Sequence, residues 1–246
     1  MTTKNAVILV AGEGKRLLPF TLTHPKCFAP VAGKRILENA LESLSANGCK
    51  EARIVVGHHA ELIRESITDR FANMTIQYIF NPIYKTTNSM YSLALGLEGL
   101  ESATWVIEGD VFLERSIFGL HAPHQIAWFV DSTTRSLDGA FVEHCGNSTA
   151  ISLQIIRDLK LLKPNQSKSI GVIHLSELGV LQLRGWLQEG IQAGRQNQYY
   201  DLILGDHMDS GVVHIVDVAG RKWFEIDSNE DLSCATELFT AIKSEL

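Results

Sequence analysis

A glycine-rich loop with basic residues follows the first apolar run of the sequence and has the composition of an anion-binding site. Gly12 and Gly14, separated by one residue, let the backbone approach a phosphate group closely and offer it N–H donors. Arg16 lies inside the loop, and Lys26 follows it. A Walker A loop is excluded because its G-K-[ST] ending is missing, and a dinucleotide fingerprint would need a third glycine and an immediate helix, which Pro19 interrupts. The segment is therefore interpreted as a phosphate-binding loop that carries its own cations.

Two aspartates, far apart in the sequence, each follow an apolar run that is typical of a strand. Asp110 comes shortly after residues 105–107, and Asp227 comes directly after residues 223–226. The carboxyl ends of strands in an α/β sheet border the ligand crevice. Magnesium takes one or two carboxylates and completes its shell with phosphate oxygens and water. The pair is a candidate metal site, although either aspartate taken alone is more typical of a helix N-cap.

Short polar side chains stand at the start of a predicted helix at residues 89–97. Thr87, Asn88 and Ser89 follow the segment that begins at Asn81 and Pro82. At a helix N-terminus such groups can read a base or a ribose, and the alternative is a plain helix cap.

These residues need a sheet to bring them together, and the apolar runs predict one. Strands are expected at residues 6–10, 53–56, 75–80, 105–107 and 126–130, with helices at 36–47, 60–71 and 89–97 between them. Strands separated by helices at this spacing predict a parallel sheet. Later strands are expected at 139–144 and 150–156 as a hairpin, and at 169–175, 212–216 and 223–226, with helices at 178–194, 200–207 and 232–246.

Composition narrows the possible classes of protein. The 246 residues are 45% hydrophobic, with a net charge of -6, which argues against a nucleic-acid binder with a basic face. The N-terminus lacks the features of a signal peptide, and no run is apolar enough for a membrane span. The four cysteines are scattered, which favours thiols in a reducing compartment, so a cytoplasmic location is expected.

The string G-x-G-x-R-L-x-P-F-T, followed by P-K and V-x-G-K, resembles the signature of nucleotidyltransferases that activate sugar phosphates and phosphocholine. It is carried here by Gly12, Gly14, Arg16, Pro19, Thr21, Pro25, Lys26, Val31, Gly33 and Lys34. The resemblance implies an α/β fold, a three-layer α/β/α sandwich with a mixed, mainly parallel sheet. No linker, repeat or low-complexity segment divides the sequence, so one domain is expected over residues 1–246, with a nucleotide-binding half (1–131) and an acceptor-binding half with a closing helix (132–246).

The same resemblance implies roles for individual residues. Arg16 and Lys26 would hold the triphosphate and the attacked α-phosphate as catalytic residues, and Asp110 and Asp227 would jointly bind Mg²⁺. Glu108, where phosphocholine-type members often carry Asp, would support the site rather than bind the metal. Nucleotide-binding positions are expected at Val10, Ala11, Gly12, Glu13, Gly14, Thr87, Asn88 and Ser89.

The string N-P-x-Y-x-x-x-N-S-x-Y-S-L at residues 81–93 looks like that of phosphocholine and phosphonate cytidylyltransferases, which favours CTP. The expected acceptor is a small phosphate or phosphonate such as 2-aminoethylphosphonate or phosphocholine, contacted by Lys163, Lys168, Tyr200 and Asp201. A pocket without an aromatic cluster favours the primary amine over choline. Two alternatives stay open: a sugar-1-phosphate nucleotidyltransferase using UTP or dTTP, and a non-catalytic nucleotide-sensing protein. A homodimer is also left open, and neither nucleic acid nor membrane is an expected partner.

Overall fold

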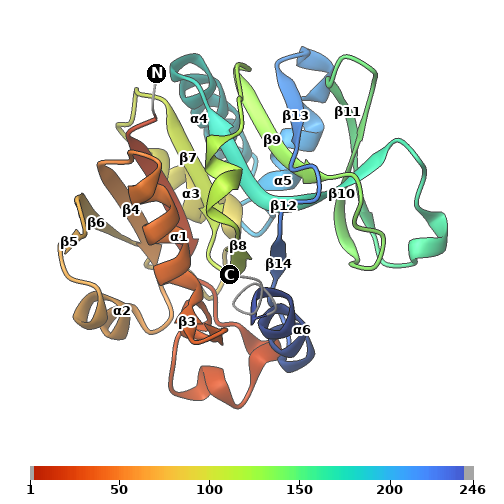
Figure 1. Cartoon of the computed structure of the whole chain (residues 1–246). Helices are drawn as coiled ribbons and strands as arrows, with labels where there is room; N and C mark the ends of the chain where they lie inside the picture. The colour runs from red at the N-terminus through yellow and green to blue at the C-terminus, as the bar shows by residue number, and fades with distance from the viewer. Residues whose placement is uncertain (1–2, 241–246) are drawn as a thin grey trace.

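The structure, a computed structural model, describes residues 3–240. Its centre is a ten-stranded mixed sheet (Figure 1). The strand β1 (Asn5–Val10) pairs in parallel with β4 (Glu51–Val56) and with β7 (Thr104–Glu108), and β4 pairs in parallel with β6 (Met74–Phe80). The predicted parallel strands of the first half are therefore confirmed.

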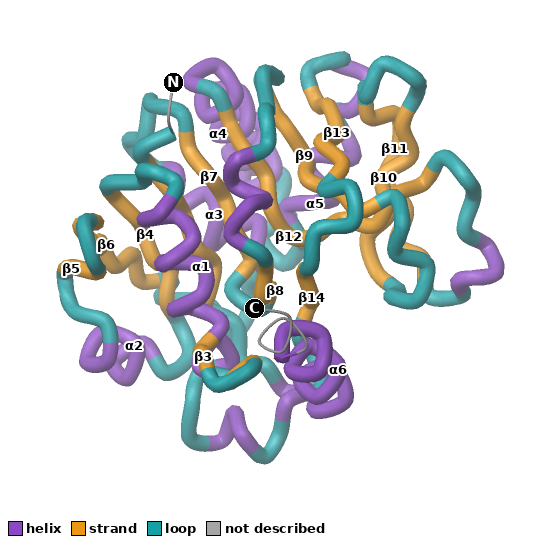
Figure 2. The backbone as a smooth tube through the Cα atoms, viewed as in Figure 1, coloured by secondary structure: helices purple, strands orange, loops and turns teal. Residues whose placement is uncertain are grey.

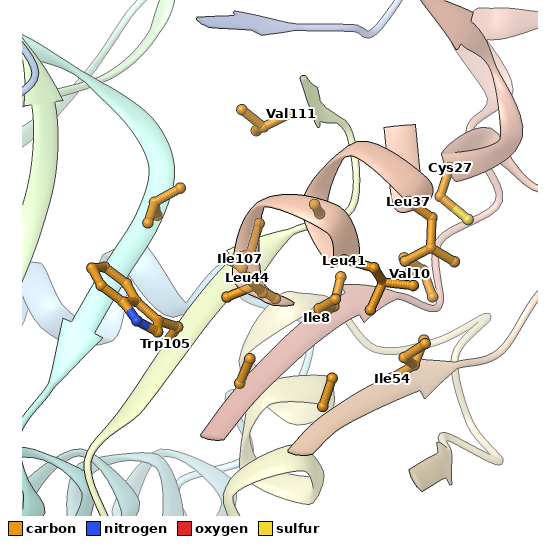
Figure 3. Packing of buried hydrophobic residues seen from close by; sticks show 14 of the residues in the cluster. Ile8, Val10, Cys27, Leu37, Leu41, Leu44, Ile54, Trp105, Ile107 and Val111 are labelled. Atoms are coloured by element: carbon orange, nitrogen blue, oxygen red, sulfur yellow. The ribbon is translucent and has the colours of Figure 1, made fainter. Parts of the chain in front are cut away.

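Helices cover both faces of the sheet because successive side chains of a strand point to opposite sides. One face carries α1 (Ile36–Ala46) and α2 (Ala60–Ser66), and the other carries α3 (Ser89–Leu97), α4 (Glu177–Gln192) and α5 (Tyr200–Asp206). Ile8 and Val10 of β1 share a buried cluster with Leu41 of α1, as Figure 3 shows. Val7 shares the opposite cluster with Leu93 of α3. This arrangement confirms the predicted three-layer α/β/α sandwich.

The second half of the chain extends this sheet through a long strand, β12 (Gln166–Leu175). It runs antiparallel to β7, to β9 (Ile126–Asp131) and to β10 (Gly139–His144). The strand β10 forms the predicted hairpin with β11 (Ala150–Ile156), and β9 pairs in parallel with β13 (Val213–Asp217). The sheet is thus mixed, with its parallel strands at the centre.

Two short strand pairs lie outside the main sheet. They join β8 (Val111–Leu113) to β14 (Trp223–Glu225) and β2 (Pro30–Val31) to β3 (Lys34–Arg35), both antiparallel. Figure 2 shows α6 (Asn229–Thr240) next to β14, at one end of the sandwich. A separate buried cluster joins this region to the start of the chain through Leu17, Ala29, Val31, Ile36, Phe112, Ile226 and Ala235. These contacts carry the C-terminal strand back to the glycine-rich loop.

One predicted helix is wrong in its second half. The helix expected at residues 60–71 ends at Ser66, and β5 (Arg70–Phe71) pairs antiparallel with β6. The buried Ile63 and Ile67 keep helical spacing, which explains the expectation. Beyond them the chain turns back so that it can complete the sheet edge. The apolar periodicity cannot show that turn.

The closing helix, expected at residues 232–246, begins three residues earlier, at Asn229, and its described part ends at Thr240. The remainder of that prediction lies outside the described residues. Within residues 3–240 we find no helix with the length and apolarity that a membrane crossing requires.

Candidate active site

A cleft of about 710 Å³ opens where the glycine-rich loop, the carboxyl ends of β1 and β7, and the start of α3 meet. This is the edge at which α/β sheets bind their ligands. Fourteen of the sixteen predicted site residues line it: Val10, Ala11, Gly12, Glu13, Gly14, Arg16, Lys26, Thr87, Asn88, Ser89, Asp110, Lys168, Asp201 and Asp227. The fold therefore gathers into one cleft segments that are more than 200 residues apart in the sequence.

The two candidate metal ligands meet around a lysine. The Lys26 ammonium donates to Asp110 Oδ2 at 2.8 Å and to Asp227 Oδ1 at 2.6 Å. The guanidinium of Arg16 lies 2.7 Å from the other oxygen, Asp227 Oδ2. The pairing of β8 with β14 brings the aspartates together, and the N–H of Ile226 donates to the carbonyl of Asp110 at 2.9 Å. Two basic and two acidic side chains thus form a single ionic cluster.

The charges of this cluster hold each other in their ionised forms. Burial by itself would lower the pKa of Lys26, but Asp110 and Asp227 outweigh it and raise the pKa. Burial by itself would raise the pKa of Asp227, but Lys26 and Arg16 outweigh it and lower the pKa. At neutral pH the cluster therefore contains a charged lysine and a charged Asp227.

Glycines allow the strand ends to approach each other at the cleft. Gly109 donates its N–H to the carbonyl of Leu9 at 2.9 Å, and a Cβ at Gly109 would lie only 2.6 Å from that same oxygen. A side chain at this position would push Asp110 away from the end of β1. In the loop, Gly14 has a left-handed φ of 62°, and a Cβ there would lie 2.9 Å from the Cβ of Lys26. The loop backbone consequently lies against the lysine.

The polar residues before α3 combine a structural role with a place in the cleft. Asn88 is the N-cap of the helix, and its Oδ1 accepts from the N–H of Ser89 at 2.8 Å. The hydroxyl of Thr87 donates to the carbonyl of Ile83 and accepts from Asn81 at 3.1 Å. The helix-cap alternative therefore describes the geometry of Asn88, while all three predicted residues also line the cleft.

Further carboxyl groups line the cleft near Asp110. Asp201 is 9% exposed, and its Oδ1 is buried without a hydrogen-bond partner in the described part of the chain. Burial raises the pKa of Asp201 to about 7, with Lys168 acting in the opposite direction. Burial also raises the pKa of Glu108 well above its ordinary range, and the negative charge of Asp201 adds to the shift. An unpartnered buried carboxylate in a cleft is a candidate for contacting a ligand.

Three residues predicted to contact the acceptor have other positions or partners. Lys168 is buried, and its Nζ donates to Glu225 Oε2 at 2.9 Å, so its charge is already paired. Lys163 is outside the cleft lining, because its exposed side chain turns toward Glu143 at 3.6 Å. Tyr200 is fully buried among the core residues of α3 and α4 and does not line the cleft, whereas its half-exposed neighbour Tyr199 does.

The aspartate pair suits a magnesium ion that also binds phosphates. Within residues 3–240 no group of three or more acidic, histidine or cysteine side chains is arranged to hold a metal by itself. Magnesium bound through one or two carboxylates and substrate phosphates needs no such group. Asp110 Oδ1 is buried and has no partner among the described residues, so the protein itself does not satisfy this oxygen. The residues present therefore fit the metal.

Glu225 and Asn81 are examples of cleft residues that were not among the predicted site residues. Glu225 lies two positions before Asp227 and therefore projects to the same side of an extended chain, which was the available signal. Asn81 is buried and donates to the hydroxyls of Thr87 and Ser92, so it fixes the turn before α3. That role depends on contacts which spacing alone does not reveal.

Comparisons with known proteins agree with this geometry. The chain is 29% identical over 235 residues to CMP-5'-(3-aminopropyl)phosphonate synthase of Streptomyces rubellomurinus, covering 92% of this chain and 37% of that protein. The chain thus spans little more than a third of that relative. It is 25% identical to choline-phosphate cytidylyltransferase of Streptococcus pneumoniae, covering 92% of this chain and 94% of that protein.

Solved structures share the fold. The inositol-1-phosphate CTP transferase of T. maritima superposes with a TM-score of 0.80 at 22% identity, covering 99% of this chain and 97% of that one. The CTP:phosphocholine cytidylyltransferase of Streptococcus pneumoniae gives 0.77 at 21% identity, covering 97% of this chain and all of the other. The family model for nucleotidyl transferases matches residues 5–127, which contain the glycine-rich loop, Lys26 and Asp110. The chain belongs to the nucleotidyl transferase family.

Proposed function

We propose that the protein is a magnesium-dependent cytidylyltransferase that transfers CMP from CTP to a small acceptor and releases pyrophosphate. The acceptor carries a phosphonate or phosphate at one end and an ammonium at the other. The observation that carries the proposal is the joint placement of Arg16, Lys26, Asp110 and Asp227 in one cleft that further carboxyl groups also line. The similarity to two proteins named as a CMP-phosphonate synthase and a cytidylyltransferase supports CTP as the donor.

The chemistry needs positioning and charge more than a base. An acceptor phosphonate oxygen is already ionised at neutral pH and attacks the α-phosphorus of CTP; the new O–P bond forms while the bond to pyrophosphate breaks. Arg16 and Lys26, beside the glycine-rich loop, neutralise the charge that spreads over the phosphoryl oxygens. Asp110 and Asp227 would hold Mg²⁺, which supplies further neutralisation of the triphosphate when bound.

The carboxyl groups of the cleft support a cationic acceptor through Asp201. Glu225 is paired with Lys168, and the raised pKa of Glu108 favours its neutral form, so Asp201 is the one of these three carboxyl groups that is available to an ammonium. Asp201 Oδ1 has no partner among the described residues and can accept a hydrogen bond from an N–H group, which a primary ammonium has and a trimethylammonium lacks. Tyr84 and Tyr199 are the aromatic residues among the described residues that line the cleft, fewer than the aromatic cage that surrounds a quaternary ammonium. The acceptor proposed here is therefore an aminoalkyl phosphonate or phosphate.

Asp201 gives this proposal a pH dependence. Because the raised pKa is about 7, the carboxylate is charged above that pH and pairs with the acceptor ammonium, and it is protonated below. At about pH 8, Asp201→Asn is expected to raise the KM for 2-aminoethylphosphonate by ~10-fold or more, the worth of a charge-assisted hydrogen bond. At about pH 6 the two proteins should differ much less.

Wild type and Asp201→Asn are measured with the same acceptor. Ionisation of the acceptor's phosphonate therefore changes both KM values by the same factor and cancels in their ratio. Initial rates of pyrophosphate release over the pH range give both KM values. A ratio of the two that stays constant with pH would contradict the role of Asp201.

The proposal is tested by competition among 2-aminoethylphosphonate, phosphocholine, glucose-1-phosphate and inositol phosphate at equal concentration, with CTP, UTP or dTTP. The expected result is CTP-dependent modification of 2-aminoethylphosphonate. A preference for phosphocholine would refute the pairing of Asp201 with a primary ammonium, but the protein would still be a cytidylyltransferase. A preference for glucose-1-phosphate with UTP or dTTP would overturn the proposal and support a sugar-1-phosphate enzyme.

A further inference from the structure

The candidate metal ligands are occupied by the protein's own cations. The carboxylates of Asp110 and Asp227 have four oxygens between them. Lys26 takes one from each residue, at 2.8 and 2.6 Å, and Arg16 takes a third at 2.7 Å. The fourth, Asp110 Oδ1, is buried. A divalent cation that bridges both aspartates would therefore meet an ammonium between its ligands.

The charges of the cluster also oppose the binding of a divalent ion. Two carboxylates are matched by one ammonium and one guanidinium, so the cluster is neutral. The Lys26 side chain is only 15% exposed, which limits screening of its charge by solvent. A divalent ion that enters this cluster faces repulsion from both cations.

The same two cations lie beside the loop that would hold the triphosphate. Gly14 packs so closely on Lys26 that an added Cβ would lie 2.9 Å from the lysine Cβ, and Arg16 belongs to the loop itself. A triphosphate on this loop offers both side chains new anionic partners within reach of a side-chain rotation. Lys26 and Arg16 would then move from the aspartates to the phosphates without losing an anionic partner.

We infer that the metal site is gated by the nucleotide. The Lys26 and Arg16 side chains close the Asp110–Asp227 pair until a nucleoside triphosphate draws them onto its phosphates. Divalent cation and nucleotide then bind with strong positive coupling, and each raises the affinity of the other by the same factor. This inference rests on the proposed function, because it takes Asp110 and Asp227 as the metal ligands.

The test measures binding of Mn²⁺ alone, by electron paramagnetic resonance and by calorimetry, with neither nucleotide nor acceptor present. Wild type should bind Mn²⁺ weakly at this site, and Lys26→Met should bind it at least ~10-fold more tightly because the blocking charge is gone. Adding Asp110→Asn to Lys26→Met should abolish the gain. Lys15→Met is the matched control, since Lys15 is an exposed loop lysine paired with Glu13 rather than with the aspartates.

The inference is overturned if wild type binds Mn²⁺ as tightly as Lys26→Met, or if Lys15→Met gives the same gain. Lys26→Gln, which keeps a donor without the charge, provides the same comparison if the methionine variant is poorly folded. Because no CTP is present, a failure here leaves CMP transfer untouched. Conversely, the lack of CMP transfer in a turnover assay would not alter the Mn²⁺ result.

Discussion

Asp110→Asn and Asp227→Asn are each expected to lower the rate of CMP transfer by at least ~10²-fold, which corresponds to about 2.7 kcal/mol of lost transition-state stabilisation. Each change removes half of the negative charge that we assign to the metal. Both carboxylates line the cleft and are partly exposed, so the fold should survive. The measurement is the rate of pyrophosphate release at saturating CTP over a range of Mg²⁺ concentrations.

Asp206→Asn is the matched control for these variants. It makes the same substitution in an aspartate that pairs with Arg195 away from the cleft lining, so turnover should stay close to wild type. Circular dichroism on all three proteins separates loss of function from loss of fold. Near-normal turnover of Asp227→Asn at limiting Mg²⁺ would reject the two-carboxylate metal site.

Arg16→Ala and Lys26→Ala are expected to reduce turnover more than they raise the KM for CTP. Negative charge on the α-phosphate oxygens builds up during attack, so cations aimed there act mainly on the transition state. For Lys26 the loss should reach ~10²-fold, typical of removing one such group. Steady-state kinetics with varied CTP separate the two parameters.

Lys50→Ala serves as the control, because this lysine is exposed and does not line the cleft. Its effect on turnover should be small. If Arg16→Ala and Lys26→Ala both showed unchanged turnover with only a higher KM, their assignment to the transition state would be rejected.

The central sheet could be predicted because its strands have a local signature. The run in β1 is apolar on both sides of the strand, as burial between two helical layers requires, and the helices that follow keep 3.6-residue spacing. The strands that were not predicted are short ones whose formation depends on pairing with another strand. The short strands β2, β3, β5 and β8 contain two or three residues each, too few to show a period, and they exist because a partner strand lies beside them.

The position of the candidate site could be predicted for the same reason, since strand ends and a glycine-rich loop are visible in sequence. The hydrogen bonds and ion pairs between side chains within the site could not be predicted. Lys168 is expected to meet an acceptor phosphate, and the bulge in β12 around Gly171 and the pairing of β14 also place it against Glu225, a contact that the sequence does not reveal. The direction of Tyr200 also depends on how α5 packs against α3, which places its ring in the core and leaves Asp201 at the cleft.

Transfer of CMP to an aminoalkyl phosphonate can be followed in one reaction by ³¹P NMR. Purified protein is incubated with CTP, 2-aminoethylphosphonate and Mg²⁺, and the phosphorus resonances are followed over time. We expect equal amounts of pyrophosphate and of a new phosphonate–phosphate anhydride, with neither formed in a parallel reaction with Lys26→Ala. Binding of CTP without either product, across the whole panel of acceptors, would show instead that the protein senses nucleotides without turning them over.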